Sequence, residues 1–269
     1  MPVSHWADKP PLVLTRPAAQ QAAWQEALTA LGVTVVGWPM IDIAPAHDPK
    51  SLTRAWHRLP DVDLVFFASP NAVAAVMAAC PPGKVWPERA WAACVGPGSA
   101  EALRAAGVPS HKVLSPPSNG AQFDSEALWP ILQRLAPWAG KAVLLLRGQG
   151  GREWLADRLR ADGAFVEAEA VYQRQCPRPN AEQAAILQTL MAAQPEPLWL
   201  LSSSEAVSHW QTLAGPLPPL PVLATHPRIA AAARAAGLRV TEVLPTVQAV
   251  ADAWHLHVAV PRQGGPAAP

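Results

Sequence analysis

The chain has 269 residues, of which 50% are hydrophobic, and a formal net charge of +1. This apolar content is enough for two cores, and without a concentrated basic run neither a nucleic acid nor a membrane surface is expected as a partner. Three widely spaced cysteines outside any Cys-x-x-Cys pattern, and no apolar run near the roughly 18 residues of a membrane-spanning helix, predict a cytoplasmic protein with reduced thiols, which we expect to be a monomer.

A strand-turn-helix unit that ends in glycine recurs four times along the chain. The units begin at Leu12, Ala93, Val143 and Val222, and their helices end at Gly32, Gly107, Gly163 and Gly237. Counted between glycines, the first and third units are 131 residues apart and the second and fourth are 130 apart. The similar segments that begin at Ser69 and Ser203 are 134 apart. Glycine is common at helix ends, but three parallel offsets indicate an internal duplication.

Short apolar runs alternate with helical patterns, which is typical of a parallel sheet covered on both faces. The clearest runs are residues 64–68, 91–95, 143–146, 198–201 and 222–224. In the first helix, an apolar stripe at helical spacing is predicted to face a sheet, and it consists of Trp24, Ala27, Leu28 and Leu31. The sequence therefore predicts an α/β protein of two flavodoxin-like lobes, each a parallel sheet flanked by helices.

Two extended segments interrupt the repeating unit, one over residues 37–45 and one over 167–177, and each is closed by proline. Side by side they would form a two-stranded connector, with residues 38–43 and 167–172 as the hinge. The chain would then build one discontinuous lobe from 10–37 and 173–258, and an inserted lobe from 44–166, with a cleft between the two. Residues 1–9 and 261–269 are expected to be disordered tails.

The common cofactor and hydrolase motifs are absent from the sequence. No Gly-x-Gly-x-x-Gly follows the first strand, and no phosphate-binding Gly-x-x-x-x-Gly-Lys, His-Glu-x-x-His or Gly-x-Ser-x-Gly occurs. The glycine-rich stretch 147–153 could hold an anion at a helix N-terminus or could be a tight strand-to-helix turn. We therefore expect no metal and no organic cofactor.

Small polar residues recur instead where the predicted strands end. Because ligands bind outside the carboxyl ends of parallel strands, where helices also begin, this set predicts a site for a ligand with many carboxylates. Taken singly, each hydroxyl could be a helix N-cap and each arginine a solvated surface group. The predicted binding residues are Thr15, Arg16, Ser69, Asn71, Gly98, Ser99, Arg147, Ser202, Ser203 and His226.

Tyr172 is the single tyrosine of the chain and lies in the second extended segment. A phenol is neutral at pH 7 and can donate a proton, which makes this side chain a candidate general acid. The alternative is an aromatic side chain that packs against the connector.

The motifs, taken in order from Leu12 to about His257, resemble the uroporphyrinogen-III synthase family. Those that carry the resemblance are Leu14-Thr15-Arg16-Pro17, residues 67–73 around Ser69-Pro70-Asn71, Val95-Gly96-Pro97-Gly98-Ser99-Ala100, Leu146-Arg147-Gly148, Val171-Tyr172-Gln173-Arg174 and Leu201-Ser202-Ser203. Two departures are visible: Ala68 and Ser99 stand where the family often has threonine.

This resemblance implies two lobes with a two-stranded connector and a cofactor-free cyclase. Its implied substrate is hydroxymethylbilane, a linear tetrapyrrole with eight carboxylates, which loses its terminal hydroxyl and closes through a spiro intermediate with the last ring inverted. The tyrosine matching Tyr172 is the family's candidate for assisting departure of the hydroxyl. Without enzyme the bilane closes to the uninverted isomer, so the protein's task is mainly orientation.

Two alternatives remain open from the residues alone. A two-lobed binding or regulatory module for a small polyanionic ligand would share the lobes, the hinge and the strand-end donors. It would differ in having no catalytic use for Tyr172. A nicotinamide enzyme is less consistent with the sequence because the glycine fingerprint is missing.

Overall fold

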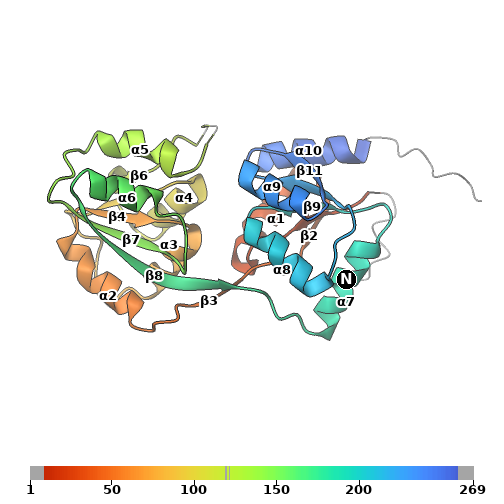
Figure 1. Ribbon diagram of the computed structural model, residues 1–269, viewed down its shortest axis with the longest axis horizontal. Coiled ribbons are helices and arrows are strands. Elements are labelled where there is room, and N and C mark those ends of the chain that lie inside the picture. Colours follow the sequence, from red (N-terminus) through yellow and green to blue (C-terminus); the bar gives the residue numbers. More distant parts are fainter. Residues whose placement is uncertain (1–8, 119, 121, 260–269) are drawn as a thin grey trace, which may run out of the picture. The chain divides into compact units, whose positions relative to one another are not determined.

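The computed structural model describes residues 9–118, 120 and 122–259 (Figure 1). Except for Lys9, the two tails expected to be disordered lie outside these residues. The chain divides into two compact units, the first comprising Met1–Asp42 with Gln175–Pro269 and the second comprising Ile43–Arg174. It therefore passes from the first unit to the second and returns once.

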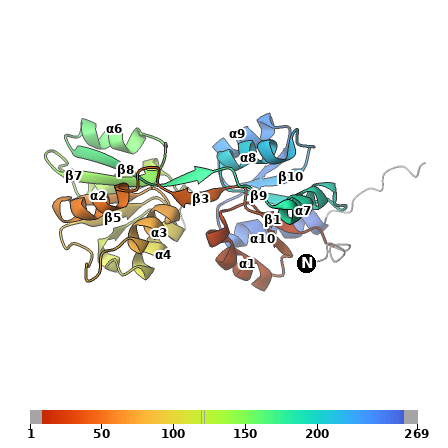
Figure 2. The same cartoon turned by 90° about the horizontal axis from the view of Figure 1, so that it is seen from below.

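The first unit contains a five-stranded sheet in the order β11-β10-β9-β1-β2, and all of its pairings are parallel. Its strands are β1 (Leu12–Leu14), β2 (Val35–Gly37), β9 (Leu198–Leu201), β10 (Pro221–Ala224) and β11 (Arg239–Glu242). Its helices are η2 (Ala18–Gln20), α1 (Gln21–Ala30), α7 (Ala181–Ala192), α8 (Ser204–Ala214), α9 (Pro227–Ala235) and α10 (Val247–Ala259). In Figure 2, α8 and α9 lie on one side of this sheet and α1 and α10 on the other.

The second unit contains a six-stranded sheet in the order β3-β8-β7-β4-β5-β6. Its strands are β3 (Asp42–Pro45), β4 (Leu64–Phe67), β5 (Trp91–Cys94), β6 (Val113–Leu114), β7 (Ala142–Gly148) and β8 (Phe165–Gln175). Its helices are α2 (Ser51–Arg58), η3 (Leu59–Asp61), α3 (Pro70–Ala78), α4 (Pro97–Ala105), η4 (Ser110–Lys112), α5 (Ser125–Gln133) and α6 (Trp154–Ala161). The predicted α/β class, with helices flanking parallel sheets, is confirmed.

The two sheets have the same spatial order of strands, but the chain enters that order at a different strand in each unit. The order β2-β1-β9-β10-β11 of the first unit matches β8-β7-β4-β5-β6 of the second. This correspondence pairs β1 with β7, β9 with β4, and β10 with β5, as the three offsets in the sequence predict. The duplicated halves are therefore circular permutations of one flavodoxin-like sheet, and β3 adds an edge strand to the second copy.

Glycines with a left-handed backbone follow all four repeated helices. Gly32, Gly107, Gly163 and Gly237 have φ values of 77°, 88°, 89° and 82°, a region that side chains with a Cβ rarely enter. The residue four positions earlier is fully buried in every copy. Leu31 is an exception to the predicted stripe, because α1 ends at Ala30 and this leucine is 38% exposed.

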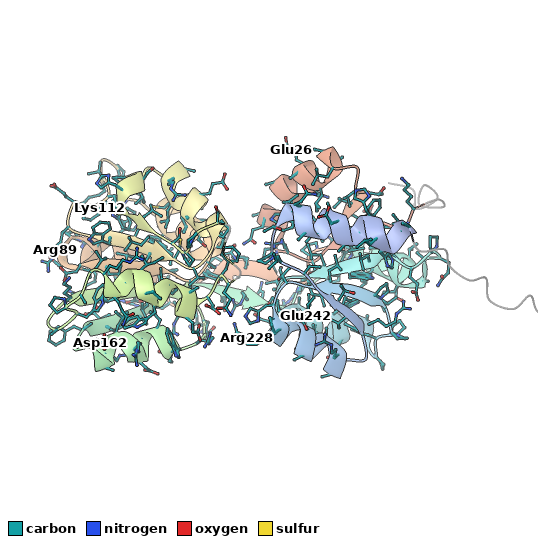
Figure 3. The ribbon with its side chains drawn as sticks, turned by 90° about the horizontal axis from the view of Figure 1, so that it is seen from above. Glu26, Arg89, Lys112, Asp162, Arg228 and Glu242 are labelled. Atoms are coloured by element: carbon teal, nitrogen blue, oxygen red, sulfur yellow. The ribbon has the colours of Figure 1, made fainter. Side chains whose placement is uncertain are left out.

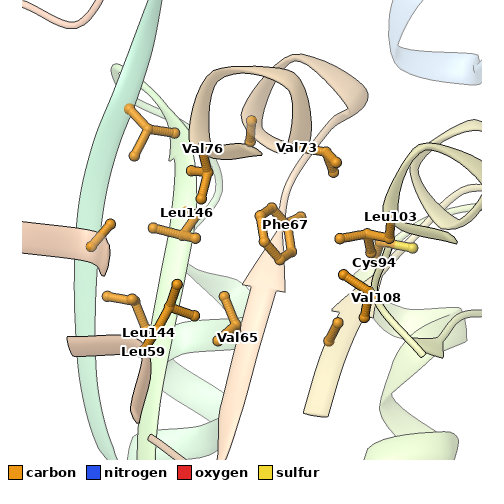
Figure 4. Close-up of a cluster of buried hydrophobic side chains, with 14 of the residues drawn as sticks. Leu59, Val65, Phe67, Val73, Val76, Cys94, Leu103, Val108, Leu144 and Leu146 are labelled. Atoms are coloured by element: carbon orange, nitrogen blue, oxygen red, sulfur yellow. The ribbon is translucent and has the colours of Figure 1, made fainter. Parts of the chain in front are cut away.

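Successive side chains along a strand point to opposite faces of the sheet, and each face has its own hydrophobic core. In the first unit, Leu12, Leu14 and Trp254 belong to a cluster on the α1 and α10 face. In the second unit, Leu64 and Phe66 point to the α5 and α6 face, whereas Val65 and Phe67 point to the other. Figure 4 shows Val65 and Phe67 beside Leu144 and Leu146 of β7.

Charged side chains of both signs are spread over the surface of each unit. Figure 3 labels Glu26, Arg228 and Glu242 on the first unit and Arg89, Lys112 and Asp162 on the second. Arg54 bridges to Glu169 at 2.7 Å, which ties α2 to β8. The labelled side chains and this ion pair show the mixture of positive and negative surface charges that is consistent with the near-zero net charge.

Candidate active site

A pair of hydroxyls is the centre of the candidate site in the second unit. The register between β7 and β8 shifts at one point, where Arg147 pairs with Ala170 but Gly148 pairs with Tyr172. This bulge places the tyrosine opposite a glycine. The Tyr172 Oη lies 2.9 Å from Ser69 Oγ, and the tyrosine is only 2% exposed. Its ring belongs to the core, as the packing alternative expects, while its hydroxyl is hydrogen bonded at the carboxyl end of β4.

Ser69 is the N-cap of α3, and the Ala72 N–H donates to its Oγ at 3.3 Å. One hydroxyl therefore serves the helix and the tyrosine together. Asn71 is half-buried in the first turn of the same helix. Ser69 is thus both a helix N-cap, as the alternative interpretation expects, and a predicted binding residue of the second unit.

Gly98 and Ser99 lie in the first turn of α4, which packs beside α3. Gly98 is exposed, and a Cβ there would come no closer than 3.9 Å to another residue, the nearest atom being Pro70 Cγ. Ser99 is 3% exposed and packs toward the interior. Of the two, Gly98 is the position that a ligand can reach.

Arg147 is held by an acidic neighbour that the sequence reasoning did not single out. Its Nη2 lies 2.5 Å from the Glu153 Oε1, while its Nη1 is buried without a hydrogen-bond partner in the described part of the chain. The guanidinium therefore has a carboxylate on one side and an unsatisfied donor on the other. The Glu153 carboxylate already binds this guanidinium, and the binding prediction requires Arg147 to bind a carboxylate of the ligand in the same way.

Thr15 follows β1 in the first unit and is 1% exposed. Its hydroxyl donates to the carbonyl oxygen of Leu200 at 2.6 Å, which joins β1 to β9. The side chain is committed to this contact, so the structure gives it a role in sheet cohesion.

We expect Thr15→Val to lower the free energy of unfolding by about 1–3 kcal/mol, because the isosteric change leaves a buried acceptor without its donor. Thr241→Val, at an exposed position of β11, is the matched control and should change stability little. Urea unfolding of both variants measures the difference. Equal midpoints would show that the Leu200 contact does not stabilise the sheet.

Arg16 follows Thr15 and stacks on an aromatic ring. Its Cζ lies 4.0 Å from the centre of the Trp24 ring, and its Nε is buried without a hydrogen-bond partner in the described part of the chain. Burial lowers the pKa of Arg16 to about 10, which leaves it charged at pH 7. Among the described residues, no carboxylate forms an ion pair with this desolvated cation, a condition that favours an anionic ligand.

The remaining predicted residues lie at the carboxyl ends of β9, which pairs with β1, and of β10, the next strand in the sheet. Ser202 and Ser203 are half-buried, and the Ser203 Oγ accepts the Glu205 N–H at 3.2 Å as the N-cap of α8. The His226 Nδ1 accepts the Arg228 N–H at 3.1 Å as the N-cap of α9. Because Nδ1 is an acceptor here, a neutral His226 carries its proton on Nε2.

Sequence reasoning missed a pocket of about 500 Å³ in the first unit. Trp38, Pro39 and Ile41, just beyond β2, form one part of its lining, and Pro177 and Arg178, before α7, form another. The available signal was the proline-flanked arginine at 177–179. The segment between β2 and β3 is not the continuous extended strand expected over 37–45, because the buried Trp38, Met40 and Ile41 turn into the unit.

Within the described ranges, no group of three histidine, cysteine or acidic side chains is arranged to hold a metal ion. Cys80, Cys94 and Cys176 are free, and burial raises the pKa of Cys94 to about 11, which keeps this thiol protonated at neutral pH. No helix in the described part of the chain is long and apolar enough to span a membrane.

Comparisons with known proteins indicate the same family as the order of the sequence motifs. The family model described as "Uroporphyrinogen-III synthase HemD" matches residues 22–251. A uroporphyrinogen-III synthase of Salmonella typhimurium is 33% identical over 166 residues, which cover 61% of this chain and 64% of the relative. One of Synechococcus elongatus is 31% identical over 178 residues, or 65% of this chain and 64% of the relative. The matches thus span slightly less than two thirds of these curated relatives.

Two solved structures share the fold. A uroporphyrinogen-III synthetase of Helicobacter pylori aligns with a TM-score of 0.57 at 14% identity, covering 93% of this chain and 99% of that one. A mutant uroporphyrinogen III synthase of Thermus thermophilus aligns with a TM-score of 0.54 at 18% identity, covering 92% and 97%. At these identities the likeness concerns the arrangement of strands and helices.

Proposed function

Because the chain belongs to the uroporphyrinogen-III synthase family, we propose that it cyclises hydroxymethylbilane to uroporphyrinogen III, with inversion of the terminal pyrrole ring and loss of water. The protein is then a cyclising lyase of tetrapyrrole biosynthesis whose partner is this small molecule. The observation that carries the proposal at the level of residues is the hydrogen bond between Tyr172 and Ser69 at the carboxyl end of β4.

In the proposed reaction, Tyr172 donates its proton to the terminal hydroxyl of the bilane, which leaves as water. Electrons from the adjacent pyrrole form the exocyclic double bond of an azafulvene. The substituted carbon of the last ring then attacks this electrophile, and the spiro intermediate fragments and recloses with that ring inverted. The closing ring loses a proton as its aromaticity is restored, and this proton returns to the phenolate of Tyr172. Tyr172 is only 2% exposed, and its hydroxyl is hydrogen bonded to Ser69. To receive the proton, the substrate hydroxyl must therefore contact the phenol oxygen next to Ser69 or in its place.

The other proposed contacts hold the carboxylates of the substrate. Arg16 lies just after β1, and Arg147 lies near the carboxyl end of the equivalent strand β7. Each has a buried side-chain nitrogen without a hydrogen-bond partner in the described part of the chain. Ser203 caps α8 just after β9. Charge-assisted hydrogen bonds at such positions bind carboxylates strongly and direct the last ring toward the correct carbon.

The test of this function is to supply enzymatically generated hydroxymethylbilane to the purified protein, oxidise the product and resolve the porphyrin isomers. The proposal expects the type III isomer to dominate. A binding or regulatory module would leave the spontaneous type I isomer as the main product, and that result would refute the proposal.

We also expect the reaction to need no metal, because the proposed steps use only a phenol, hydroxyls and arginines. Exhaustive chelation followed by dialysis should leave the type III yield within error of the untreated protein. A yield that falls and returns on addition of one divalent metal would contradict this expectation. Treated protein should also be checked for unchanged thermal unfolding, so that any loss can be assigned to chemistry.

A further inference from the structure

Gly148 lies against the ring of Tyr172 more closely than any side chain would permit. A Cβ built on this glycine would lie 2.8 Å from Tyr172 Cζ, 3.0 Å from Cε2 and 3.1 Å from the hydroxyl oxygen. The backbone of Gly148 does not adopt the left-handed conformation, so conformational freedom does not explain the glycine. The space that it leaves is filled by the outer end of the phenol.

The β-bulge at the same place explains why the phenol is there. Up to Arg147, β7 and β8 pair in continuous register, and the shift then sets Tyr172 opposite Gly148. The Gln149 N–H donates to the Tyr172 carbonyl oxygen at 3.1 Å, which fixes the backbone just beyond the bulge. Bulges commonly redirect a side chain near an active site, and this one directs the ring over the glycine toward Ser69.

We propose that Gly148 and Ser69 are positioning residues, which hold the Tyr172 hydroxyl in the orientation for proton donation. The inference rests on the proposed function and adds how its acid is set in place. Gly148 acts by having no side chain, and Ser69 acts through the 2.9 Å contact between hydroxyls.

Either hydroxyl could donate in this hydrogen bond, and the proposal takes Ser69 as the donor. The Ser69 Oγ already accepts the Ala72 N–H at 3.3 Å, at the positive end of the helix dipole. Its own proton is then free to be donated to the phenol oxygen. With Ser69 as the donor, Tyr172 keeps its proton for the substrate hydroxyl, and the serine stabilises the negative charge left on the phenol oxygen.

The experiment uses the single tyrosine of the chain as its own reporter. Protein labelled with ¹³C at the tyrosine Cζ gives one protein signal, whose chemical shift reports hydrogen bonding at the phenol oxygen. We expect Ser69→Ala and Gly148→Ala to move this signal and Ser69→Thr, which retains a hydroxyl, to restore it. The two controls are Asp124→Ala, which removes the N-cap of α5, and Gly96→Ala, whose added Cβ meets nothing within 4 Å. Neither control should move it.

The same variants are then assayed with hydroxymethylbilane. We expect kcat for the type III product to fall about tenfold in Ser69→Ala, and about 10²-fold in Gly148→Ala through displacement of the acid, with KM little changed. An unmoved Cζ signal in both variants, or a KM increase with unchanged kcat in Ser69→Ala, would overturn the positioning roles. If the wild type makes no type III product, the proposed function fails, whereas the NMR signal still decides whether the two residues hold the phenol.

Discussion

Tyr172→Phe should form the type III isomer about 10²- to 10⁴-fold more slowly than the wild type, which is the usual contribution of one general acid. The change removes the hydroxyl and keeps the ring that packs in the core of the second unit. Only the contact with Ser69 is lost, so we expect a stability loss of about 1 kcal/mol and a thermal midpoint within a few degrees of the wild type.

The product distribution makes this prediction sharper than a rate alone. As the catalysed rate falls, spontaneous closure overtakes it and the mixture shifts toward the uninverted type I isomer. Circular dichroism checks that the variant is folded, and isomer analysis at several enzyme concentrations separates the catalysed path from the spontaneous one. A folded variant with wild-type output of type III isomer would leave Tyr172 as a packing residue and assign catalysis to orientation alone.

Replacing Arg16 or Arg147 by methionine should raise KM about tenfold in each case while lowering kcat less, because each lost contact binds the substrate and the transition state similarly. The double variant should show roughly the product of the two effects if the contacts are independent. Arg239→Met and Arg89→Met are the matched controls. Arg239 starts β11 and bonds to Glu196, while Arg89 bonds to Asp63 just before β4, so both lie at the amino ends of strands.

Arg16→Met carries a second expected result, an increase in stability. Burial lowers the pKa of Arg16 to about 10, so the folded state binds this proton less tightly than the unfolded chain does. The buried charge therefore costs stability at every pH below about 10, and that cost is relieved only as the pH rises further. Removing the charge should raise the thermal midpoint at pH 7 by about 2–4 °C while KM increases.

A KM that stays at the wild-type value in both arginine variants would place these side chains outside the binding site.

The repeats in the sequence were enough to predict the paired sheets. Gly32 and Gly163 mark the same point of β1-α1 and β7-α6 because both helices need a left-handed residue to end, and a local backbone requirement is visible in local sequence. The circular permutation was not predictable in the same way. It depends on which strands become neighbours, and β4 lies beside β7 through parallel pairing between residues far apart in the chain.

The positions of candidate site residues were predictable where they depend on a strand end and a helix start, as at Ser69 and Ser203. Their partners were not. The contact between Tyr172 and Ser69 requires a one-residue bulge in β8, and no feature of the sequence marks a bulge without knowing the pairing partner. The commitment of Thr15 to the Leu200 carbonyl likewise depends on a strand 185 residues away.

The proposed cyclisation is tested most directly by the isomer ratio formed from one preparation of hydroxymethylbilane by the wild type, Tyr172→Phe and Arg89→Met, with a protein-free sample in parallel. We expect mainly type III isomer with the wild type and with Arg89→Met, and a shift toward type I with Tyr172→Phe. If the wild-type ratio equals that of the protein-free sample at every enzyme concentration, the chain does not direct the cyclisation and the proposed function is wrong.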